Sequence, residues 1–233
     1  MREIPDRVVT LILTDLPYGI TQNDWDSVIP LDKLWAEYKR ILVPNGAIVL
    51  TASQPFTTKV IASNFEMFKY CWVWKKGTKP TGFLNAKKQP LRITEDVVVF
   101  YREQCKYHPQ MTIGEVCHKR GKTVNTDAHK TTNYGKYVDV NTEGDMKYPL
   151  NLIDIPRDVE KVHPTQKPVA LFEYLIRTYT DEGDVVLDSC LGSGTTLKAC
   201  MSTNRIGLGF EIDPTHEPLI KSRIAQGTLQ MTA

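Results

Sequence analysis

Short runs of β-branched and aromatic residues alternate along this chain with stretches of helical periodicity. The strand-like runs cover residues 8–14, 47–51, 70–74, 96–101, 185–188 and 206–210. Apolar residues at helical spacing lie between them at 31–42, 54–64 and 165–176. This alternation is typical of parallel βαβ construction. We therefore expect an α/β protein with a doubly wound, mostly parallel sheet.

Residues 103–162 interrupt this rhythm. They are rich in Thr, Asn, Gly, Lys and Tyr and show little periodicity, which predicts an insertion rather than another βα unit. A chain of 233 residues can form one α/β domain with one insertion. The predicted organisation is therefore 1–102 and 163–233 as two parts of one domain, with 103–162 inserted. A partly disordered connector is the alternative.

Composition excludes several classes of protein. The longest apolar runs are far shorter than the ~20 residues that a membrane span needs, and no charged leader precedes an apolar stretch. Five cysteines, an odd number without a CxxC pair, indicate reduced thiols. The Cys and His spacing matches no familiar zinc pattern. We expect a cytoplasmic protein that binds neither a metal nor a membrane.

The run LILTDLPYG, residues 11–19, places an acid, a proline and an aromatic directly after an apolar strand. Open α/β sheets bind ligands at the carboxyl ends of their strands, where Asp15 is predicted to lie. Pro17 removes one backbone donor and leaves the loop rich in acceptors. Asp15, the Leu16 carbonyl and the Tyr18 ring could therefore hold a flat group bearing an NH2, such as a nucleobase. The alternative is that Asp15 caps a turn and Tyr18 belongs to the core.

A second strand-to-helix turn occurs in DVVLDSCLGSGTTLKAC, residues 184–200. The predicted strand ends at Asp188, and Gly192 and Gly194 lie in the turn. Glycines let the backbone approach a ligand, and a helix N-terminus supplies free N–H groups. The next strand ends near Glu211, whose carboxylate could accept hydrogen bonds from ribose hydroxyls. This order predicts a nucleoside-cofactor pocket, whereas no Lys stands where a Walker loop requires one.

Positive charge is concentrated between residues 69 and 92. This segment contains seven Lys or Arg residues and no Asp or Glu, with aromatic residues interleaved. Such a composition is expected of a surface that follows a phosphate backbone, and a solvated loop is the alternative. The predicted DNA-contacting cations are Lys75, Lys76, Lys79, Lys87, Lys88 and Arg92, with Lys119 and Arg120 from a second basic cluster.

Together these motifs resemble those of the amino-group DNA methyltransferases that use S-adenosylmethionine, in the β arrangement, where the catalytic motif precedes the cofactor motif. The family's Asp-Pro-Pro-Tyr resembles DLPY at residues 15–18, and its Asp-Pro-Phe-x-Gly-x-Gly-Thr resembles DSCLGSGT at 188–195. A third family element, HPTQKP, stands at 163–168. The resemblance covers most of the chain apart from about 103–160.

The resemblance implies a fold of the S-adenosylmethionine methyltransferase type. Residues 1–102 would form the catalytic part, 103–162 an inserted target-recognition region and 163–233 the cofactor-binding part. The implied reaction is methyl transfer to adenine N6 of a base flipped out of double-stranded DNA. The residues expected to be catalytic are Asp15, Leu16, Pro17 and Tyr18. The residues expected to bind the cofactor are Asp15, Thr165, Gln166, Lys167, Asp188, Leu191, Gly192, Ser193, Gly194, Thr195 and Glu211.

The resemblance leaves several alternatives open. Asp at the first catalytic position favours adenine only as a family tendency, and cytosine N4 is the nearest alternative. Relatives usually begin with an additional strand ending in Gly-Asp, and this chain starts at Met1 with REIPDR, so we expect that strand to be missing. A nucleic-acid-binding module without turnover is therefore another alternative. A homodimer and a cognate restriction endonuclease are further partners that the family allows.

Overall fold

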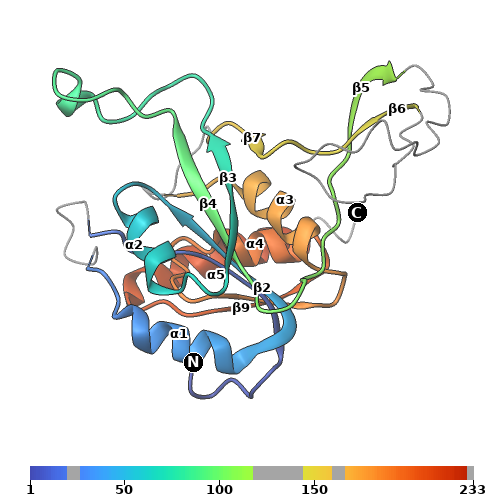
Figure 1. The fold of residues 1–233 in the computed structure, drawn as a ribbon. Helices are drawn as coiled ribbons and strands as arrows, with labels where there is room; N and C mark the ends of the chain where they lie inside the picture. Colours follow the sequence, from blue (N-terminus) through green and yellow to red (C-terminus); the bar gives the residue numbers. More distant parts are fainter. Residues whose placement is uncertain (20–26, 118–143, 159–165, 230–233) are drawn as a thin grey trace. The chain divides into compact units, whose positions relative to one another are not determined.

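The computed structural model describes residues 1–19, 27–117, 144–158 and 166–229 (Figure 1). It contains two compact units, Met1–His108 with Asn151–Ala233, and Pro109–Leu150. No helix within the described ranges is long and apolar enough to cross a membrane. The same residues contain no group of three or more His, Cys, Asp or Glu side chains that could hold a metal ion. The predicted site residues Thr165, Lys119 and Arg120 lie outside the described residues.

The larger unit is built around a seven-stranded sheet with the order β7-β3-β4-β2-β1-β8-β9. Every neighbouring pair is parallel except the two that involve β4. The prediction of a mostly parallel α/β sheet is therefore confirmed. The strands are β1 (Val9–Asp15), β2 (Leu42–Ala52), β3 (Phe68–Lys75), β4 (Thr94–Phe100), β7 (Leu152–Asp154), β8 (Val185–Asp188) and β9 (Ile206–Gly209).

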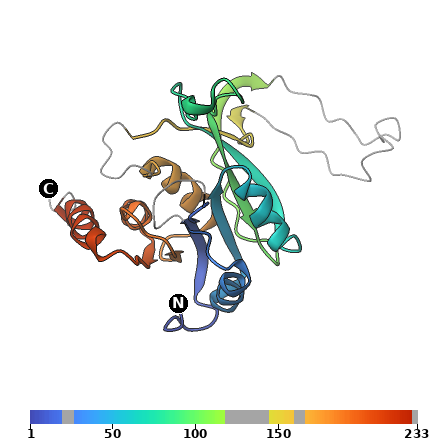
Figure 2. The same ribbon diagram turned by 90° about the vertical axis from the view of Figure 1, so that its left-hand side faces the viewer.

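Helices cover both faces of this sheet (Figure 2). One core lies between the sheet and α1 and α2, and a second core lies between the sheet and α3 and α4. Along β1, Ile12 points into the first core while Leu11 and Leu13 point into the second, as the alternation of a pleated strand requires. The helices are α1 (Leu31–Ile41), α2 (Phe56–Ser63), α3 (Val169–Tyr179), α4 (Thr195–Ser202) and α5 (Glu217–Leu229).

Three acidic residues meet at one edge of the sheet. β1, β8 and β9 are parallel neighbours, so their carboxyl ends lie together. Asp15 ends β1, Asp188 ends β8, and Glu211 follows two residues after the last residue of β9. The topology therefore brings the first predicted motif and the second to adjacent strand ends, which is where open α/β sheets bind ligands.

Several element boundaries differ from the predictions, and the largest differences are at the start of β2 and the start of α3. The helix predicted over 31–42 ends at Ile41, and β2 begins at once and continues through the Pro44–Gly46 segment, where its register against β1 shifts. A Cβ atom at Gly46 would lie 2.8 Å from the Thr10 carbonyl oxygen, so the close approach of the two strands requires glycine. Helix α3 starts later than predicted, with Pro168 as its N-cap residue rather than in its first turn.

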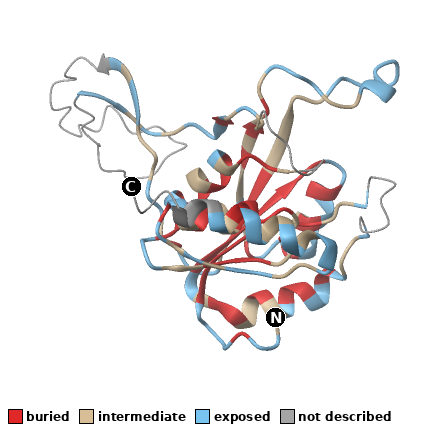
Figure 3. Ribbon diagram, turned by 180° about the vertical axis from the view of Figure 1, so that it is seen from behind, coloured by how far each residue is buried: buried red, intermediate tan, exposed pale blue. Residues whose placement is uncertain are grey.

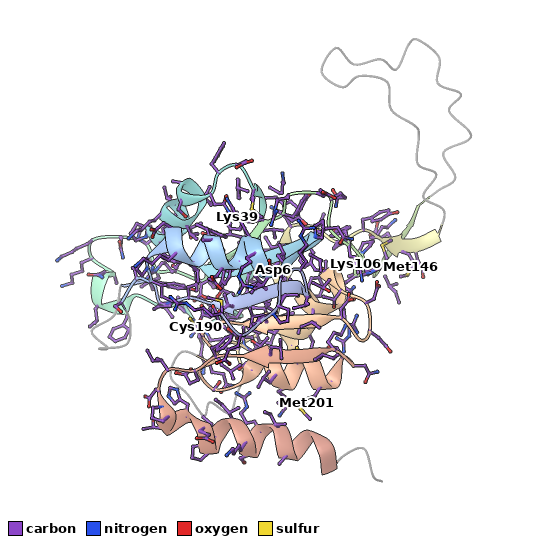
Figure 4. All side chains as sticks on the ribbon, turned by 90° about the horizontal axis from the view of Figure 1, so that it is seen from below. Asp6, Lys39, Lys106, Met146, Cys190 and Met201 are labelled. Carbon is purple, nitrogen blue, oxygen red and sulfur yellow. The ribbon has the colours of Figure 1, made fainter. Side chains whose placement is uncertain are left out.

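Part of the predicted insertion, 103–162, belongs to the larger unit. β7 lies within that range and pairs in parallel with β3. Lys106, labelled in Figure 4, forms an ion pair with Asp184 at 2.7 Å. A three-residue strand is too short for periodicity to reveal, which is why the sequence showed only an interruption.

The smaller unit, Pro109–Leu150, contains an antiparallel strand pair. Its strands are β5 (Thr112–Cys117) and β6 (Gly144–Lys147). Ile113 lies opposite Met146, and both side chains are exposed.

Candidate active site

Asp15 lies at the end of β1, and its side chain is oriented by two hydroxyl groups. Tyr18 Oη donates a hydrogen bond to Asp15 Oδ1 at 2.6 Å, and Thr51 Oγ1 donates to the same oxygen. Thr51 is the register partner of Asp15 in the β1–β2 pair, so the sheet itself places this hydroxyl. The carboxylate is therefore held in one orientation by the strand pair and by its own loop.

Lys167 is the second neighbour of this carboxylate. Its Nζ lies 2.6 Å from Asp15 Oδ2 and 3.5 Å from Glu95 Oε2, and the side chain is only 9% exposed. Burial alone would lower the pKa of Lys167, but the charges of Asp15 and Glu95 outweigh it and raise the pKa. Lys167 is therefore a buried, charged ammonium group between two carboxylates.

The network continues from Glu95 to Lys76, one of the predicted DNA-contacting cations. Lys76 Nζ lies 2.9 Å from Glu95 Oε1 and 3.3 Å from Thr81 Oγ1, and Lys76 is only 6% exposed. Burial lowers the pKa of Lys76, and Glu95 partly offsets this effect. The prediction that Lys76 contacts a phosphate backbone is therefore corrected. Its ammonium group points inward because an acidic residue on the neighbouring strand pairs with it.

Tyr18 provides an aromatic ring beside Asp15. The ring stacks on Phe56, with centroids 5.1 Å apart and an interplanar angle of 23°, and Lys167 Nζ lies 5.6 Å from its centroid. Burial and the nearby Asp15 carboxylate raise the pKa of Tyr18, so its phenol stays protonated and donates. Leu16 is buried in the core, and Pro17, between Leu16 and Tyr18 in the chain, is partly buried. The carboxylate, the Leu16 carbonyl and the ring thus lie within one short loop.

Asp188, at the end of β8, is buried, and both of its carboxylate oxygens accept hydrogen bonds from the protein. Its Oδ1 accepts hydrogen bonds from Thr14 Oγ1 at 2.6 Å and from the Cys190 backbone N–H at 3.0 Å, and its Oδ2 accepts from Thr196 Oγ1. Burial raises the pKa of Asp188 to about 6, although these hydrogen bonds act in the opposite direction. Because Thr14 directly precedes Asp15, the Thr14–Asp188 bond joins the two predicted motifs.

The turn after Asp188 is held in place by the end of β9. Glu211 Oε2 accepts a hydrogen bond from the Gly192 backbone N–H at 2.6 Å, and the Leu191 N–H donates to the Phe210 carbonyl at 2.8 Å. A Cβ atom at Gly209 would lie 2.8 Å from the Leu191 side chain, so only glycine lets the turn pack this closely. Glu211 therefore fixes the turn through Oε2, while its Oε1 accepts a hydrogen bond from the Asp213 N–H at 2.9 Å. A carboxylate with two donors keeps lone pairs for a further donor.

Arg223, on α5, is a buried residue of this region that belongs to none of the sequence motifs. Its Nη1 donates to the Ser193 carbonyl at 2.8 Å, to Ser193 Oγ at 2.7 Å and to Thr195 Oγ1 at 3.3 Å. Burial lowers the pKa of Arg223, and Asp158 partly offsets this. Its position in the sequence could have indicated burial. Arg223 follows the apolar residues Leu219 and Ile220 by one helical turn, so the three side chains share one face of the helix.

The glycine turn fits the approach of a nucleoside cofactor such as S-adenosylmethionine. Gly192 and Gly194 have φ values of +52° and +78°, a conformation that other residues rarely adopt. A Cβ atom built at Gly192 meets no atom of the described residues within 4 Å, so the space above this turn is open. Gly194 is the N-cap residue of α4, where free backbone N–H groups begin.

Gln166 and most of the predicted DNA-contacting cations lie away from the Asp15 network, in hydrogen bonds, in an exposed ion pair or on an exposed loop. Gln166 Nε2 donates to Asp158 Oδ2 at 2.8 Å. Lys75 forms an exposed ion pair with Asp154 at 2.6 Å, and Arg92 Nη1 donates to Ser53 Oγ at 3.1 Å. Lys79, Lys87 and Lys88 are exposed on the loop between β3 and β4.

This chain is similar to known DNA-modifying proteins over almost its whole length. The DNA methylase family matches residues 9–222. The type II methyltransferase M.HpaI of Haemophilus parainfluenzae is 24% identical over 237 residues, which cover 96% of this chain and 70% of that protein. The DNA adenine methyltransferase YhdJ of Escherichia coli (strain K12) is 28% identical over 239 residues, with coverage of 91% and 75%.

A solved structure agrees with these relatives. The crystal structure of the M1.HpyAVI–SAM complex has a TM-score of 0.63 and 26% sequence identity, and the match covers 94% of this chain and 89% of that one. The family match includes both strand-end motifs, the loop between β3 and β4 and helix α3. The chain belongs to the DNA methylase family.

Proposed function

We propose that this protein transfers the methyl group of S-adenosylmethionine to N6 of an adenine in double-stranded DNA. The observation that carries the proposal is the Thr14–Asp188 hydrogen bond, 2.6 Å long, which joins the strand end carrying Asp15 to the strand end carrying the glycine turn. An amine held at Asp15 would thus lie beside a cofactor held at the turn. Adenine is favoured because YhdJ, 28% identical, is named a DNA adenine methyltransferase.

Asp15 and Leu16 are proposed to hold the amine. Asp15 Oδ2 accepts a hydrogen bond from Lys167 among the described residues, which leaves a lone pair for one amine N–H. The Leu16 carbonyl accepts from the other N–H, and Tyr18 offers its ring to the base. An exocyclic amine is a weak nucleophile because its lone pair is delocalised, so orienting both N–H groups redirects that lone pair.

The bound cofactor supplies an electrophilic methyl carbon. On transfer of this methyl group to adenine N6 the cofactor would leave as a thioether, and Asp15 would accept one amine proton and pass it to solvent. The chain's contribution is placement of the two reactants in line, so the proposed mechanism needs no covalent enzyme intermediate.

The cofactor is proposed to lie over the turn between β8 and α4. Gly192, Ser193, Gly194 and Thr195 supply its backbone surface, Leu191 its apolar wall and Glu211 an acceptor for ribose hydroxyls. Asp188 contributes by holding the turn, since its oxygens are bonded to the protein. Thr165, Gln166 and Lys167 are proposed to line the methionine end, next to Asp15.

DNA is proposed to lie along the basic loop between β3 and β4, with contacts from Lys75, Lys79, Lys87, Lys88 and Arg92. Lys119 and Arg120, which lie outside the described residues, are also proposed to contact DNA. Within the predicted segment 103–162, the smaller unit Pro109–Leu150 is proposed as the target-recognition region, with 1–102 and 163–233 as the catalytic and cofactor-binding parts. We further propose that the protein is cytoplasmic, that it forms a homodimer and that it acts together with a cognate restriction endonuclease. The exposed lysines of the loop support the DNA contacts.

The test is transfer of a tritiated methyl group to DNA by the wild type and by Asp15→Ala, followed by nucleoside analysis of the product. We expect labelled N6-methyladenine from the wild type and none from Asp15→Ala. Asp6→Ala removes an exposed carboxylate that pairs with Arg40 at 2.6 Å, and it should keep wild-type activity. Equal transfer by Asp15→Ala would overturn the mechanism, and labelled N4-methylcytosine would overturn the choice of base. DNA binding by the wild type without any transfer would favour a binding module.

A further inference from the structure

The loop between β3 and β4 carries at its tip two consecutive apolar side chains that are exposed among the residues the structure describes. Phe83 is 78% exposed and Leu84 is 86% exposed, and both belong to the short 3-10 helix Phe83–Asn85. Figure 1 shows this helix at the tip of a loop that projects from the ends of β3 and β4, and Figure 3 shows the tip as exposed. Single exposed apolar residues are common, but an adjacent pair at a projecting tip indicates a contact surface.

The tip is a structured turn. Gly82 has a φ of +87°, and the Asn85 N–H donates to the Gly82 carbonyl at 3.0 Å. At the neck of the loop, Thr81 and Arg92 exchange backbone hydrogen bonds of 2.7 and 2.9 Å. The two apolar side chains are therefore presented on a closed loop, which lowers the entropy cost of inserting them into a partner.

Charge identifies the partner as a polyanion. Residues 75–92 contain no Asp or Glu, and Lys79, Lys87 and Lys88 are exposed on either side of the tip. An apolar tip between cations is how DNA-bending proteins insert a wedge between base steps while nearby cations hold the phosphates.

The neck of the loop is bonded to the candidate active site. Arg92 Nη1 donates to Ser53 Oγ at 3.1 Å, next to the end of β2. Thr81 Oγ1 accepts a hydrogen bond from Lys76 Nζ, and Lys76 forms an ion pair with Glu95. Glu95 also pairs with Lys167, which pairs in turn with Asp15. The loop therefore rises from the same sheet edge as Asp15, which favours DNA at the active site over an anionic membrane as the partner.

We propose that Phe83 and Leu84 form a wedge that inserts into the DNA duplex beside the target base and replaces the stacking lost when that base flips out. The proposal rests on the proposed methyl transfer to DNA. Unstacking and unpairing a base cost a few kcal/mol, and stacking of a DNA base on an aromatic side chain recovers part of this cost. The wedge acts on base extrusion, whereas Asp15 and its neighbours act on the extruded base.

The test compares two duplexes that contain a sequence methylated by the wild type, one fully paired and one with an abasic site opposite the target base. The variant Phe83→Ala/Leu84→Ala should transfer methyl groups to the paired duplex about 10- to 100-fold more slowly than the wild type. On the abasic duplex, where the target base is already unpaired, its rate should approach that of the wild type. Phe65→Ala removes an exposed side chain three residues before β3 begins, at the strand end away from the loop, and should leave both rates unchanged.

Two outcomes would overturn the wedge. One is a rate on the paired duplex equal to that of the wild type, and the other is an equal loss on both duplexes. Failure of the wild type to methylate any DNA in the tritium assay is a different result, because it refutes the proposed function and with it the wedge. The melting temperature of the double variant should match that of the wild type, since both side chains are exposed.

Discussion

Lys167 Nζ lies 2.6 Å from Asp15 Oδ2, and this contact joins two residues that are 152 positions apart in the chain. One belongs to HPTQKP and the other to the DLPY loop, so the contact brings the third sequence element directly onto the first. The same ammonium group lies 3.5 Å from Glu95. Asp15 is therefore oriented before any amine reaches it, which is the condition for electrostatic catalysis by a preorganised group.

Replacing Lys167 by Met should destabilise the protein, because Asp15 and Glu95 would lose the cation between them. A quarter of the Asp15 side chain is exposed, so we expect a loss of about 2 kcal/mol, below the full cost of breaking a deeply buried pair. Urea unfolding of the purified protein measures this loss. Lys75→Met breaks the exposed pair with Asp154 and should change stability little. Equal losses of unfolding free energy in the two variants would show that the buried Lys167–Asp15 pair stabilises the protein no more than an exposed ion pair does.

Lys76 and the exposed lysines of the β3–β4 loop should differ in how DNA binding depends on salt. Lys79→Ala, Lys87→Ala and Lys88→Ala should each reduce the slope of log Kd against log salt by about one unit, because each removes a cation proposed to contact a phosphate. Lys76→Met should leave the slope unchanged, since its ammonium group is buried against Glu95. Titration of labelled duplex at several salt concentrations measures the slopes. A reduced slope for Lys76→Met would show that Lys76 contacts a DNA phosphate, as first predicted from the sequence.

The sheet edge that carries the site was predictable from local patterns. Asp15 and Asp188 follow β-branched runs, and parallel strands necessarily bring such ends together. The mostly parallel sheet follows from the same alternation of strands and helices.

The partners of those acids were not predictable, because they depend on register and on contacts distant in sequence. Thr51 reaches Asp15 through the β1–β2 register. Glu95 reaches Lys76 only because β4 runs antiparallel beside β3, a direction that sequence periodicity does not specify. For the same reason Lys76 was assigned to the DNA surface although its side chain is buried.

Arg223 should support cofactor binding through the glycine turn. Its guanidinium group binds the carbonyl and hydroxyl of Ser193, so Arg223→Met would release the turn from α5 and leave a buried carbonyl without its donor. We expect the Kd for S-adenosylmethionine to rise about tenfold, the effect of about 1.4 kcal/mol. Calorimetric titration measures the Kd, and Lys221→Ala, on the exposed face of the same helix, is the control. An unchanged Kd for Arg223→Met would show that α5 does not hold the turn in its binding conformation.

Asp188 should make stability depend on pH in the range between its ordinary pKa, 3.8, and about 6. The raised pKa means that the folded protein binds this proton more readily than the unfolded chain, so the contribution of Asp188 to stability falls as pH rises through that range. Asp188→Asn keeps a neutral side chain of similar shape and removes the effect. Relative to the wild type, its free energy of unfolding should therefore increase by up to about 3 kcal/mol between pH 4 and pH 7. Thr196→Val, which removes a hydrogen bond that lowers the pKa, should extend the pH-dependent range upward. Denaturant unfolding at half-unit pH intervals measures both effects. A difference between Asp188→Asn and the wild type that stays constant from pH 4 to pH 7 would show that burial does not raise this pKa.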